Sequence, residues 1–266
     1  DLIKMKQRVI TAVIALLIFI PLLVVGGNLF SILVVAMGLV GMSEFLTMKR
    51  KLLISPEAII AFMAVACLLV PSNWINFFPN GIFYSGFYFF TLVLLGYTVV
   101  SRNRFSFDDV GAIILGAIYS GLGFHYMIYA RQESLWMILY AFLITWITDS
   151  GAYLIGRQIG RTKLAPNISP NKTWEGSIGG TVSAVIIVGI YLFFKQGVFP
   201  YGFLTMLGIT VFLSIGAQFG DLIESAFKRH YGVKDSGKIL PGHGGILDRF
   251  DSILLVLPLM HFVGLI

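Results

Sequence analysis

The sequence predicts an all-α integral membrane protein with about nine transmembrane helices and a cytoplasmic N-terminus. Hydrophobic residues make up 57% of the 266 residues and charged residues only 12%, whereas soluble domains usually carry about 25% charged residues. A bilayer core about 30 Å thick is crossed by roughly 20 apolar residues in a helix. Because lipid offers the backbone no hydrogen-bonding partners, each apolar run should be helical. These observations exclude a soluble globular fold.

Nine apolar runs follow one another along the chain. They cover residues 9–25, 29–47, 56–71, 82–100, 110–130, 135–156, 177–194, 201–220 and 252–266. The first run is long for the core of a signal peptide and no small-residue cleavage site follows it, so we expect a retained span. We divide the chain into N-terminal transmembrane helices over 1–130 and a C-terminal transmembrane catalytic region over 131–266. The second region carries predicted cytoplasmic loops at 157–176 and 228–251.

The placement of positive charge predicts the orientation. With the N-terminus inside, all of the 19 Lys and Arg residues except Arg131 and Lys195 fall on the inner side. One span more or fewer would place many of these basic residues on the outer side. The distribution of charge therefore supports the number of spans as well as the orientation. The net charge of +6 is therefore a signal of topology and of anionic lipid, and no nucleic-acid partner is expected.

Half of the charged residues lie in two inner stretches, 149–175 and 221–251. The segment 225–251 reads SAFKRHYGVKDSGKILPGHGGILDRFD; it holds the acids Asp235, Asp248 and Asp251 and the cations Lys228, Arg229, Lys234, Lys238 and Arg249. This mixture suits polyphosphate chemistry, because carboxylates hold Mg²⁺, cations neutralise phosphate oxygens and glycines let backbone N–H groups approach. Asp248 and Asp251 would share a face on the first turn of the last helix. A solvated basic loop is the competing interpretation.

Two acids lie inside or at the end of apolar runs. Asp221 ends the eighth run and forms a polar stripe with Gln218, Glu224 and Ser225 at helical spacing. Asp149 is the only charged residue between Ser134 and Gly156. An acid at this depth is unfavourable unless it is paired or metal-bound, which indicates a functional site. A helix end that reaches water, for Asp221, and an acid neutralised within the bundle, for Asp149, are the alternatives.

The segment 168–180 reads ISPNKTWEGSIGG and precedes the seventh run. Lys172 is placed to meet a phosphate as a point charge. Glu175 is expected to bind a cation or to orient Lys172, and Ser177 to cap the following helix. A plain loop before a helix explains the same pattern equally well.

Other polar residues carry weaker signals. Cys67 is the single cysteine, so no internal disulfide can form, and we interpret it as a packed apolar residue. Isolated histidines at 125 and 261 suit packing better than ligation. Asp108 and Asp109 suit the start of a helix. Glu44 follows a long uncharged run and is expected at the membrane interface beside Lys49.

At 225–251 the sequence resembles the phosphatidate cytidylyltransferase family. The family pattern is S-x-hydrophobic-K-R-x4-K-D-x-small-x2-hydrophobic-P-x-H-G-G-hydrophobic-x-D-R-hydrophobic-D. It is met by Ser225, Phe227, Lys228, Arg229, Lys234, Asp235, Gly237, Leu240, Pro241, His243, Gly244, Gly245, Ile246, Asp248, Arg249, Phe250 and Asp251. The stretch SPNKTWEG at 169–176 resembles the same family. The resemblance covers roughly the C-terminal half of the chain.

The resemblance implies that CTP and phosphatidic acid give CDP-diacylglycerol and pyrophosphate, with Mg²⁺ and with room for a second cation such as K⁺. It also implies a homodimer embedded in membrane lipid, with a cavity open to the cytoplasm. Because no soluble extension of the eukaryotic kind is visible, a bacterial inner membrane is expected.

On this hypothesis the site residues take four kinds of role. Metal binding is assigned to Asp221, Asp248 and Asp251, with Asp149 assisting from a facing helix. Phosphate binding is assigned to Lys172, Lys228, Arg229 and Lys234, with Ser177, Gly244 and Gly245 beside the nucleotide. His243 either donates to the leaving pyrophosphate or orders its glycine-rich turn. Glu175, Asp235 and Arg249 complete the predicted catalytic set.

Two other functions remain open from sequence. A CTP-dependent polyprenol or dolichol kinase would transfer the γ-phosphate and release CDP. A secondary transporter would use Asp149 and Asp221 as coupling acids, although no inverted repeat is visible. The box of the CDP-alcohol phosphotransferases is absent, and a purely structural membrane protein would not need the charged loop.

Overall fold

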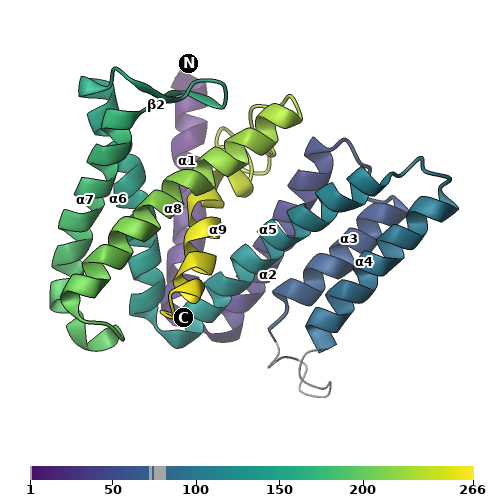
Figure 1. Cartoon of the computed structure of the whole chain (residues 1–266), viewed down its shortest axis with the longest axis horizontal. Coiled ribbons are helices and arrows are strands. Elements are labelled where there is room, and N and C mark those ends of the chain that lie inside the picture. The colour runs from purple at the N-terminus through teal and green to yellow at the C-terminus, as the bar shows by residue number, and fades with distance from the viewer. Residues whose placement is uncertain (1, 72–73, 75–81) are drawn as a thin grey trace. The chain divides into compact units, whose positions relative to one another are not determined.

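The computed structural model describes residues 2–71, 74 and 82–266, and within these residues the chain is almost wholly helical (Figure 1). The α-helices are α1 (Leu2–Val25), α2 (Gly27–Met48), α3 (Pro56–Leu69), α4 (Ile82–Val100), α5 (Phe107–Glu133), α6 (Leu135–Ile159), α7 (Trp174–Phe194), α8 (Phe203–His230) and α9 (Leu247–Phe262). A short 3-10 helix, η2 (Gln196–Val198), lies between α7 and α8. The strands β1 (Lys163–Ala165) and β2 (Ser169–Thr173) form the single described sheet.

The predicted all-α membrane fold is confirmed in its coarse form. In the described part of the chain, α2, α5, α6, α7 and α8 are long and apolar enough to cross a membrane, and three shorter apolar helices lie at Val9–Val25, Pro56–Leu69 and Tyr84–Val100. Many large apolar side chains on these helices are exposed, such as Ile186 at 59% and Phe193 at 62%. Such a surface suits lipid rather than water. The number of spans and the orientation stay predictions.

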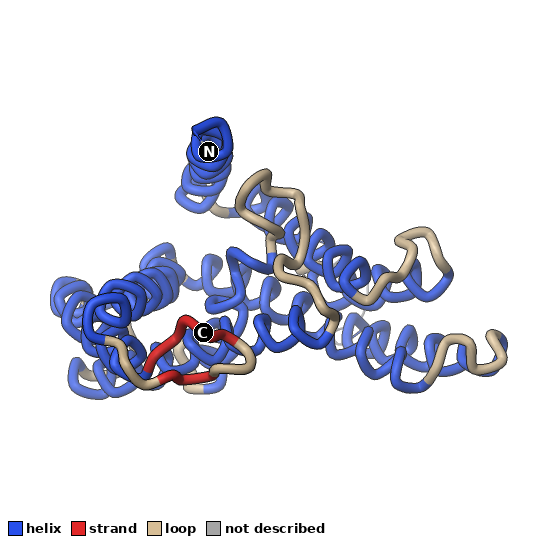
Figure 2. Tube along the Cα trace, turned by 90° about the horizontal axis from the view of Figure 1, so that it is seen from above, coloured by secondary structure: helices blue, strands red, loops and turns tan. Residues whose placement is uncertain are grey.

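The helices depart from the predicted runs around the charged segments. α8 continues to His230, ten residues beyond the predicted end at 220, because polar residues replace apolar ones along one face without breaking the helix. The predicted loop 157–176 contains the antiparallel hairpin β1–β2, drawn in red in Figure 2. Its strand β2 runs directly into α7.

The chain divides into two compact units, which we describe separately. The first unit consists of residues 1–128 and 233–249, and the second of residues 129–232 and 250–266. The segment 233–249 therefore folds with the N-terminal helices, although it follows α8 in the sequence. The predicted division at 130 and 131 stays a prediction.

In the first unit, α3 packs along α4 and α2 packs on α3 (Figure 1). Ser120 of α5 donates a hydrogen bond to the carbonyl of Gly38 in α2, with an Oγ–O distance of 2.8 Å. The core between these helices is made of fully buried apolar side chains, among them Phe30, Met42, Leu46, Leu69, Leu94, Ile113 and Phe124.

In the second unit, α6 and α7 lie side by side and α8 packs on both (Figure 1). Glycines make the first of these contacts close. A Cβ atom added to Gly176 would lie 2.6 Å from the carbonyl oxygen of Ala152, and one added to Gly180 would lie 2.5 Å from that of Thr148. Only hydrogen at these positions lets the two backbones touch. This contact brings the hairpin that precedes α7 next to the end of α6.

Candidate active site

The polar stripe predicted on α8 is present in the second unit. Gln218, Glu224 and Ser225 are exposed by 8%, 0% and 7%, and Asp221 is half-buried between them. Their spacing of three and four residues places them on one face of the helix. A helix with an otherwise apolar composition therefore directs its acids inward, toward the other helices of its unit.

Lys172 of β2 forms an ion pair with Asp221 of α8. The Nζ–Oδ2 distance is 2.5 Å, and the two side chains are 25% and 30% exposed. Ser225, one turn further along α8, donates a hydrogen bond to the other carboxylate oxygen of Asp221 at 3.3 Å. The hairpin thus delivers a lysine from outside the helices to the acid that ends the predicted eighth run.

Two further acids interact with this ion pair. Asp149 of α6 interacts electrostatically with Asp251, Asp221 and Lys172, and its Oδ2 accepts a hydrogen bond from Ser252 at 3.4 Å. The approach of α9 to α8 is close, because a Cβ atom on Gly220 would lie 2.6 Å from the carbonyl oxygen of Asp251. The predicted metal ligands Asp221 and Asp251 and the assisting Asp149 are therefore brought together within one unit.

A second lysine lies at the end of the stripe. Lys228 pairs with the fully buried Glu224 one turn earlier, with an Nζ–Oε2 distance of 3.0 Å. Lys228 also interacts electrostatically with Asp251. We call Asp149, Lys172, Asp221, Glu224, Lys228 and Asp251 the carboxylate–lysine cluster. Arg229 follows Lys228 on α8, and its Nε donates to the carbonyl of Ile168 at 3.3 Å, which ties the end of α8 to the hairpin.

The predicted cap of α7 by Ser177 and the predicted orienting of Lys172 by Glu175 need correction, whereas the other roles given to these two residues stay predictions. The helix is capped by Thr173, whose Oγ1 accepts from the N–H of Gly176 at 3.1 Å, so Ser177 lies inside the helix and is not the N-cap. Glu175 accepts hydrogen bonds from the N–H groups of Arg161 and Thr162 at 3.1 Å, which holds the base of the hairpin. Lys172 is oriented by Asp221 instead.

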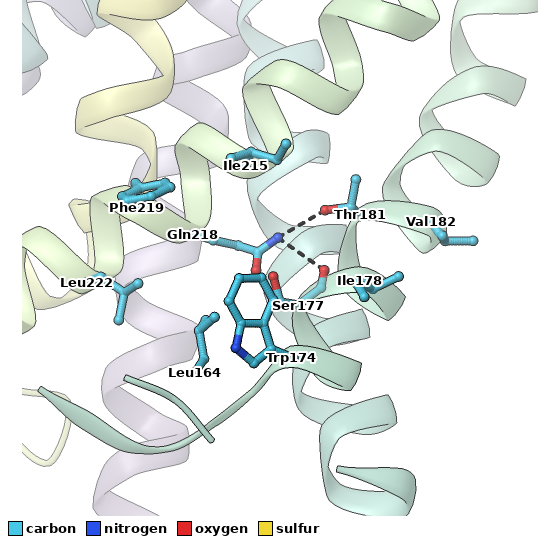
Figure 3. A pocket seen from close by; sticks show the side chains of 10 residues that line it. All are labelled: Leu164, Trp174, Ser177, Ile178, Thr181, Val182, Ile215, Gln218, Phe219 and Leu222. Carbon is cyan, nitrogen blue, oxygen red and sulfur yellow. Dashed lines mark hydrogen bonds between the residues drawn. The ribbon is translucent and has the colours of Figure 1, made fainter. Parts of the chain in front are cut away.

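An apolar cavity of about 420 Å³ lies between α7, α8 and β1 (Figure 3). Its lining is Leu164, Trp174, Ser177, Ile178, Thr181, Val182, Ile215, Gln218, Phe219 and Leu222. Gln218 is the polar point: its Nε2 donates to the carbonyl of Ser177 at 3.2 Å and to the hydroxyl of Thr181 at 3.0 Å (Figure 3). Two lining residues are close in sequence to members of the cluster: Trp174 is two residues after Lys172, and Leu222 directly follows Asp221.

The Gly-His-Gly-Gly turn belongs to the first unit. The N–H of Leu240 donates to the carbonyl of Gly244 at 3.0 Å, and the N–H of His243 donates to that of Leu240 at 2.8 Å. Gly244 has φ of +85°, a conformation that glycine adopts without strain. Arg249 donates through Nε and Nη2 to the carbonyl of His243, at 2.9 and 2.7 Å. The predicted catalytic Arg249 therefore orders this turn.

Asp248 also binds the loop. Its Oδ2 accepts from the N–H of Ser236 at 2.8 Å, from the Ser236 hydroxyl at 2.9 Å and from the N–H of Gly245 at 2.8 Å. Lys234, Asp235 and Lys238 extend into solvent from the same loop. These three contacts all use Oδ2 and order the chain. The metal role predicted for Asp248 stays a prediction.

Among the described residues, no group of three or more His, Cys, Asp and Glu side chains is arranged to hold a metal ion by itself. The donor chemistry of the carboxylate–lysine cluster still fits Mg²⁺, which commonly takes one or two carboxylates together with substrate phosphates and water. Asp221 and Asp251 supply such carboxylates, and Ser225 and Ser252 lie beside the acids.

Sequence reasoning missed two acids. Glu224 was recognised only as part of the stripe, although it is the residue that holds Lys228. Glu44 was expected at the membrane interface, which stays a prediction, but its burial and its binding to the loop in the first unit were not foreseen: 3% of the residue is exposed. The available signal was its position as the first charged residue after a long uncharged stretch.

Comparison with known proteins decides the family. The chain matches the model of the cytidylyltransferase family over residues 6–266. It belongs to that family. A protein named phosphatidate cytidylyltransferase from Bacillus subtilis is 48% identical over 266 residues, covering 98% of both chains. Proteins of the same name from Staphylococcus haemolyticus and Staphylococcus aureus are 46% and 44% identical, each covering 97% of this chain and 98% of the relative. The chain is therefore a nucleotidyltransferase, as the motif at 225–251 predicts.

Proposed function

We propose that the protein is a phosphatidate cytidylyltransferase, which makes CDP-diacylglycerol for phospholipid synthesis. A phosphate oxygen of phosphatidate attacks the α-phosphorus of CTP and forms a new P–O bond. The bond from the α-phosphorus to the oxygen that bridges to the β-phosphorus breaks, and pyrophosphate leaves with that electron pair. The attacking oxygen is already anionic, so no general base is required.

The observation that carries this proposal is the pairing of lysines with acids on the polar face of α8. Lys172 and Lys228 are held at 2.5 and 3.0 Å from Asp221 and Glu224. Such pairs keep each ammonium group in place in a site that must receive highly charged phosphates. Phosphoryl-type transfer depends mainly on positioning and on stabilising charge, which this arrangement supplies.

The cluster also offers ligands for Mg²⁺. Asp221 and Asp251 would hold the ion, with Asp149 assisting, and Asp248 remains a further predicted ligand. Bound Mg²⁺ would neutralise charge on the phosphates and orient them. The protein's own task is then to keep Lys172 and Lys228 directed at the phosphate oxygens, together with Arg229 and Lys234 as predicted from sequence. A second cation such as K⁺ is part of the same proposal.

The apolar cavity between α7 and α8 suits an acyl chain of the lipid substrate. Trp174 lines this cavity and is two residues from Lys172 in the sequence, so a phosphate bound by Lys172 would lie close along the chain to apolar side chains. Aromatic residues of this kind favour the boundary between headgroup and hydrocarbon.

The membrane setting follows from the distribution of charge. We place the protein in a bacterial inner membrane with nine spans, the N-terminus and both charged segments on the cytoplasmic side, where CTP is found. A homodimer is part of this proposal, as the resemblance implies.

The test is turnover of radiolabelled CTP with phosphatidic acid and Mg²⁺ in detergent, following both the lipid product and pyrophosphate. We expect label in a CDP-lipid, pyrophosphate in equal amount, dependence on Mg²⁺, and loss of product in Asp251→Asn. Release of CDP with phosphate transfer to a polyprenol would replace the proposal with a lipid kinase. Transport across vesicles without consumption of CTP would replace it with a transporter.

A further inference from the structure

Glu44 lies near the end of α2, well outside the two segments that carry the family resemblance. Its side chain is buried, with 3% of the residue exposed, in the unit formed by the N-terminal helices and residues 233–249. A buried carboxylate needs hydrogen-bond donors to offset its lost hydration. The donors that the structure supplies all come from the loop 236–247.

Both carboxylate oxygens of Glu44 bind this loop. Oε1 accepts from the N–H of Ile246 at 2.7 Å, and Oε2 accepts from the N–H of Leu247 at 3.0 Å. Leu247 is the first residue of α9, so Glu44 satisfies backbone N–H groups that no helical carbonyl reaches. A negative charge is also favourable at the positive end of a helix. At the other end of the loop, the Ser236 hydroxyl lies 3.0 Å from Oε2.

The loop is wrapped closely around this carboxylate. A Cβ atom on Gly237 would lie 2.7 Å from Oε1 of Glu44, and one on Gly245 would collide with Oε2 of Glu44 and with the Ser236 hydroxyl. Two small residues of the motif at 225–251 are therefore small because Glu44 occupies the space. This links the motif to a residue almost two hundred positions earlier.

Ser236 connects Glu44 to Asp248. Its hydroxyl lies 3.0 Å from Glu44 Oε2 and 2.9 Å from Asp248 Oδ2. A hydroxyl carries a single proton, so the two carboxylates share one donor. The three side chains therefore act as one network, and a change in Glu44 reaches Asp248 through one intermediate group.

We propose that Glu44 is a positioning residue of the reaction: it holds the loop 236–247 in the conformation that presents Asp248 and the Gly-His-Gly-Gly turn. The proposal rests on the proposed function for the meaning of the loop, but the contacts of Glu44 can be tested without substrate. Glu44 touches no reacting atom, so its removal should lower turnover through the loop.

The experiment compares Glu44→Gln, Glu44→Asp and Ser236→Ala with the control Ser120→Ala. The Gln side chain directs an N–H group at a backbone N–H group, which breaks at least one contact. Ser120 is a fully buried hydroxyl in the same unit, bonded to Gly38 and not to the loop. For each full-length variant in detergent, kcat, KM for CTP, melting temperature and amide hydrogen exchange of 236–247 are measured.

We expect Glu44→Gln to lower kcat by about 10- to 100-fold, as for other residues that orient a site through a neighbour. Exchange at Ser236, Ile246 and Leu247 should accelerate, and Glu44→Asp should recover part of the turnover. The double variant with Ser236→Ala should lose no more than the worse single variant, because both act through one network. Ser120→Ala should lower the melting temperature without changing loop exchange or kcat.

Normal kcat in Glu44→Gln, unchanged loop exchange, or additive losses would overturn the proposal. If Glu44→Gln does not yield folded protein, Ser236→Ala decides, since it removes only the bridging hydroxyl and must still lower kcat and speed loop exchange. If wild-type protein makes no CDP-lipid, the proposed function fails instead, and the exchange comparison still tests what Glu44 does.

Discussion

The molecule treats acidic residues in two different ways in its two units. In the second unit, Asp221 and Glu224 are paired with the side-chain ammonium groups of Lys172 and Lys228. In the first unit, Glu44 and Asp248 are bound by backbone N–H groups and by the Ser236 hydroxyl. Acids of the first kind can exchange partners when phosphates arrive, whereas acids of the second kind fix the path of the chain.

This difference separates residues that are expected to act on the substrate from residues that fix the conformation of the backbone. Lys172 can leave the partly exposed carboxylate of Asp221 for a phosphate oxygen, because one charged contact replaces another and the acid keeps some hydration. Lys228 is more constrained, because Glu224 is fully buried and would lose its charged partner. A backbone N–H group has no such alternative, and leaving it unpaired in a buried loop costs about 1–3 kcal/mol. Substitutions in the two units should therefore fail in different ways.

The largest effect is expected for Lys172→Ala. Loss of the ammonium group should lower kcat by about 10²–10³-fold, the usual loss when one charge-stabilising donor is removed, with little change in melting temperature. The matched control is Lys195→Ala, whose ammonium lies over the Trp136 ring at 3.4 Å and away from the cluster. Equal kcat values in the two variants, measured with radiolabelled CTP, would remove Lys172 from the site.

Asp248→Asn should have the next largest effect and can divide the two roles given to this residue. A neutral amide oxygen accepts weaker hydrogen bonds, so exchange at Ser236 and Gly245 should accelerate and kcat should fall about 10- to 100-fold. The Mg²⁺ dependence of the residual activity is the second readout. An unchanged Mg²⁺ requirement would confine Asp248 to ordering the loop, and near-normal turnover would end its assignment to the metal.

Gly245→Ala should show how much stability is lost when a methyl group is added to the closely packed loop. Its added methyl group meets the Glu44 carboxylate, which should destabilise the protein by about 1–3 kcal/mol through overpacking. Gly208→Ala is the control, because a Cβ atom there meets nothing within 4 Å, and alanine favours a helix by up to about 1 kcal/mol. Thermal unfolding in detergent should move in opposite directions; the same decrease in both would contradict this account of Gly245.

The smallest effect is expected at the start of α7. Thr173→Ala should cost about 1 kcal/mol through loss of the N-cap, while Ser177→Ala should leave the melting temperature almost unchanged. If Ser177→Ala lowered the melting temperature more than Thr173→Ala, Ser177 would be the N-cap, as the sequence predicts. The comparison is made on thermal stability alone.

The helices were largely predictable because apolar runs and their interruptions are local signals. Each of the nine predicted runs overlaps a described helix, although the runs 56–71, 201–220 and 252–266 extend a few residues past α3, α8 and α9, and the motif at 225–251 predicted the enzyme class. The inward acids of α8 were also predictable, since spacing along a helix sets the face of each side chain. The pairing of Lys172 with Asp221 was not, because it depends on a hairpin whose strands are too short to leave an alternating pattern.

The contacts of Glu44 were not predictable for a related physical reason. Its partners, Ser236 and Ile246, are separated from it by most of the chain, and a single sequence contains no distance information of that range. Of the donors that bind its carboxylate, those at Ile246 and Leu247 are backbone groups, which have no residue type to recognise. The glycines that surround its carboxylate were visible as glycines, but the side chain that requires them was not.

The close contact of α6 and α7 has a mechanical consequence. At Gly176 and Gly180 the nearest atoms of α6 are backbone carbonyl oxygens, so a shift of either helix along the other would cause collisions at these two positions. Membranes of different thickness make helices tilt, and we expect α6 and α7 to tilt together. The distance between Asp149 of α6 and Lys172 of β2, the strand that directly precedes α7, should therefore change little when the thickness of the bilayer changes.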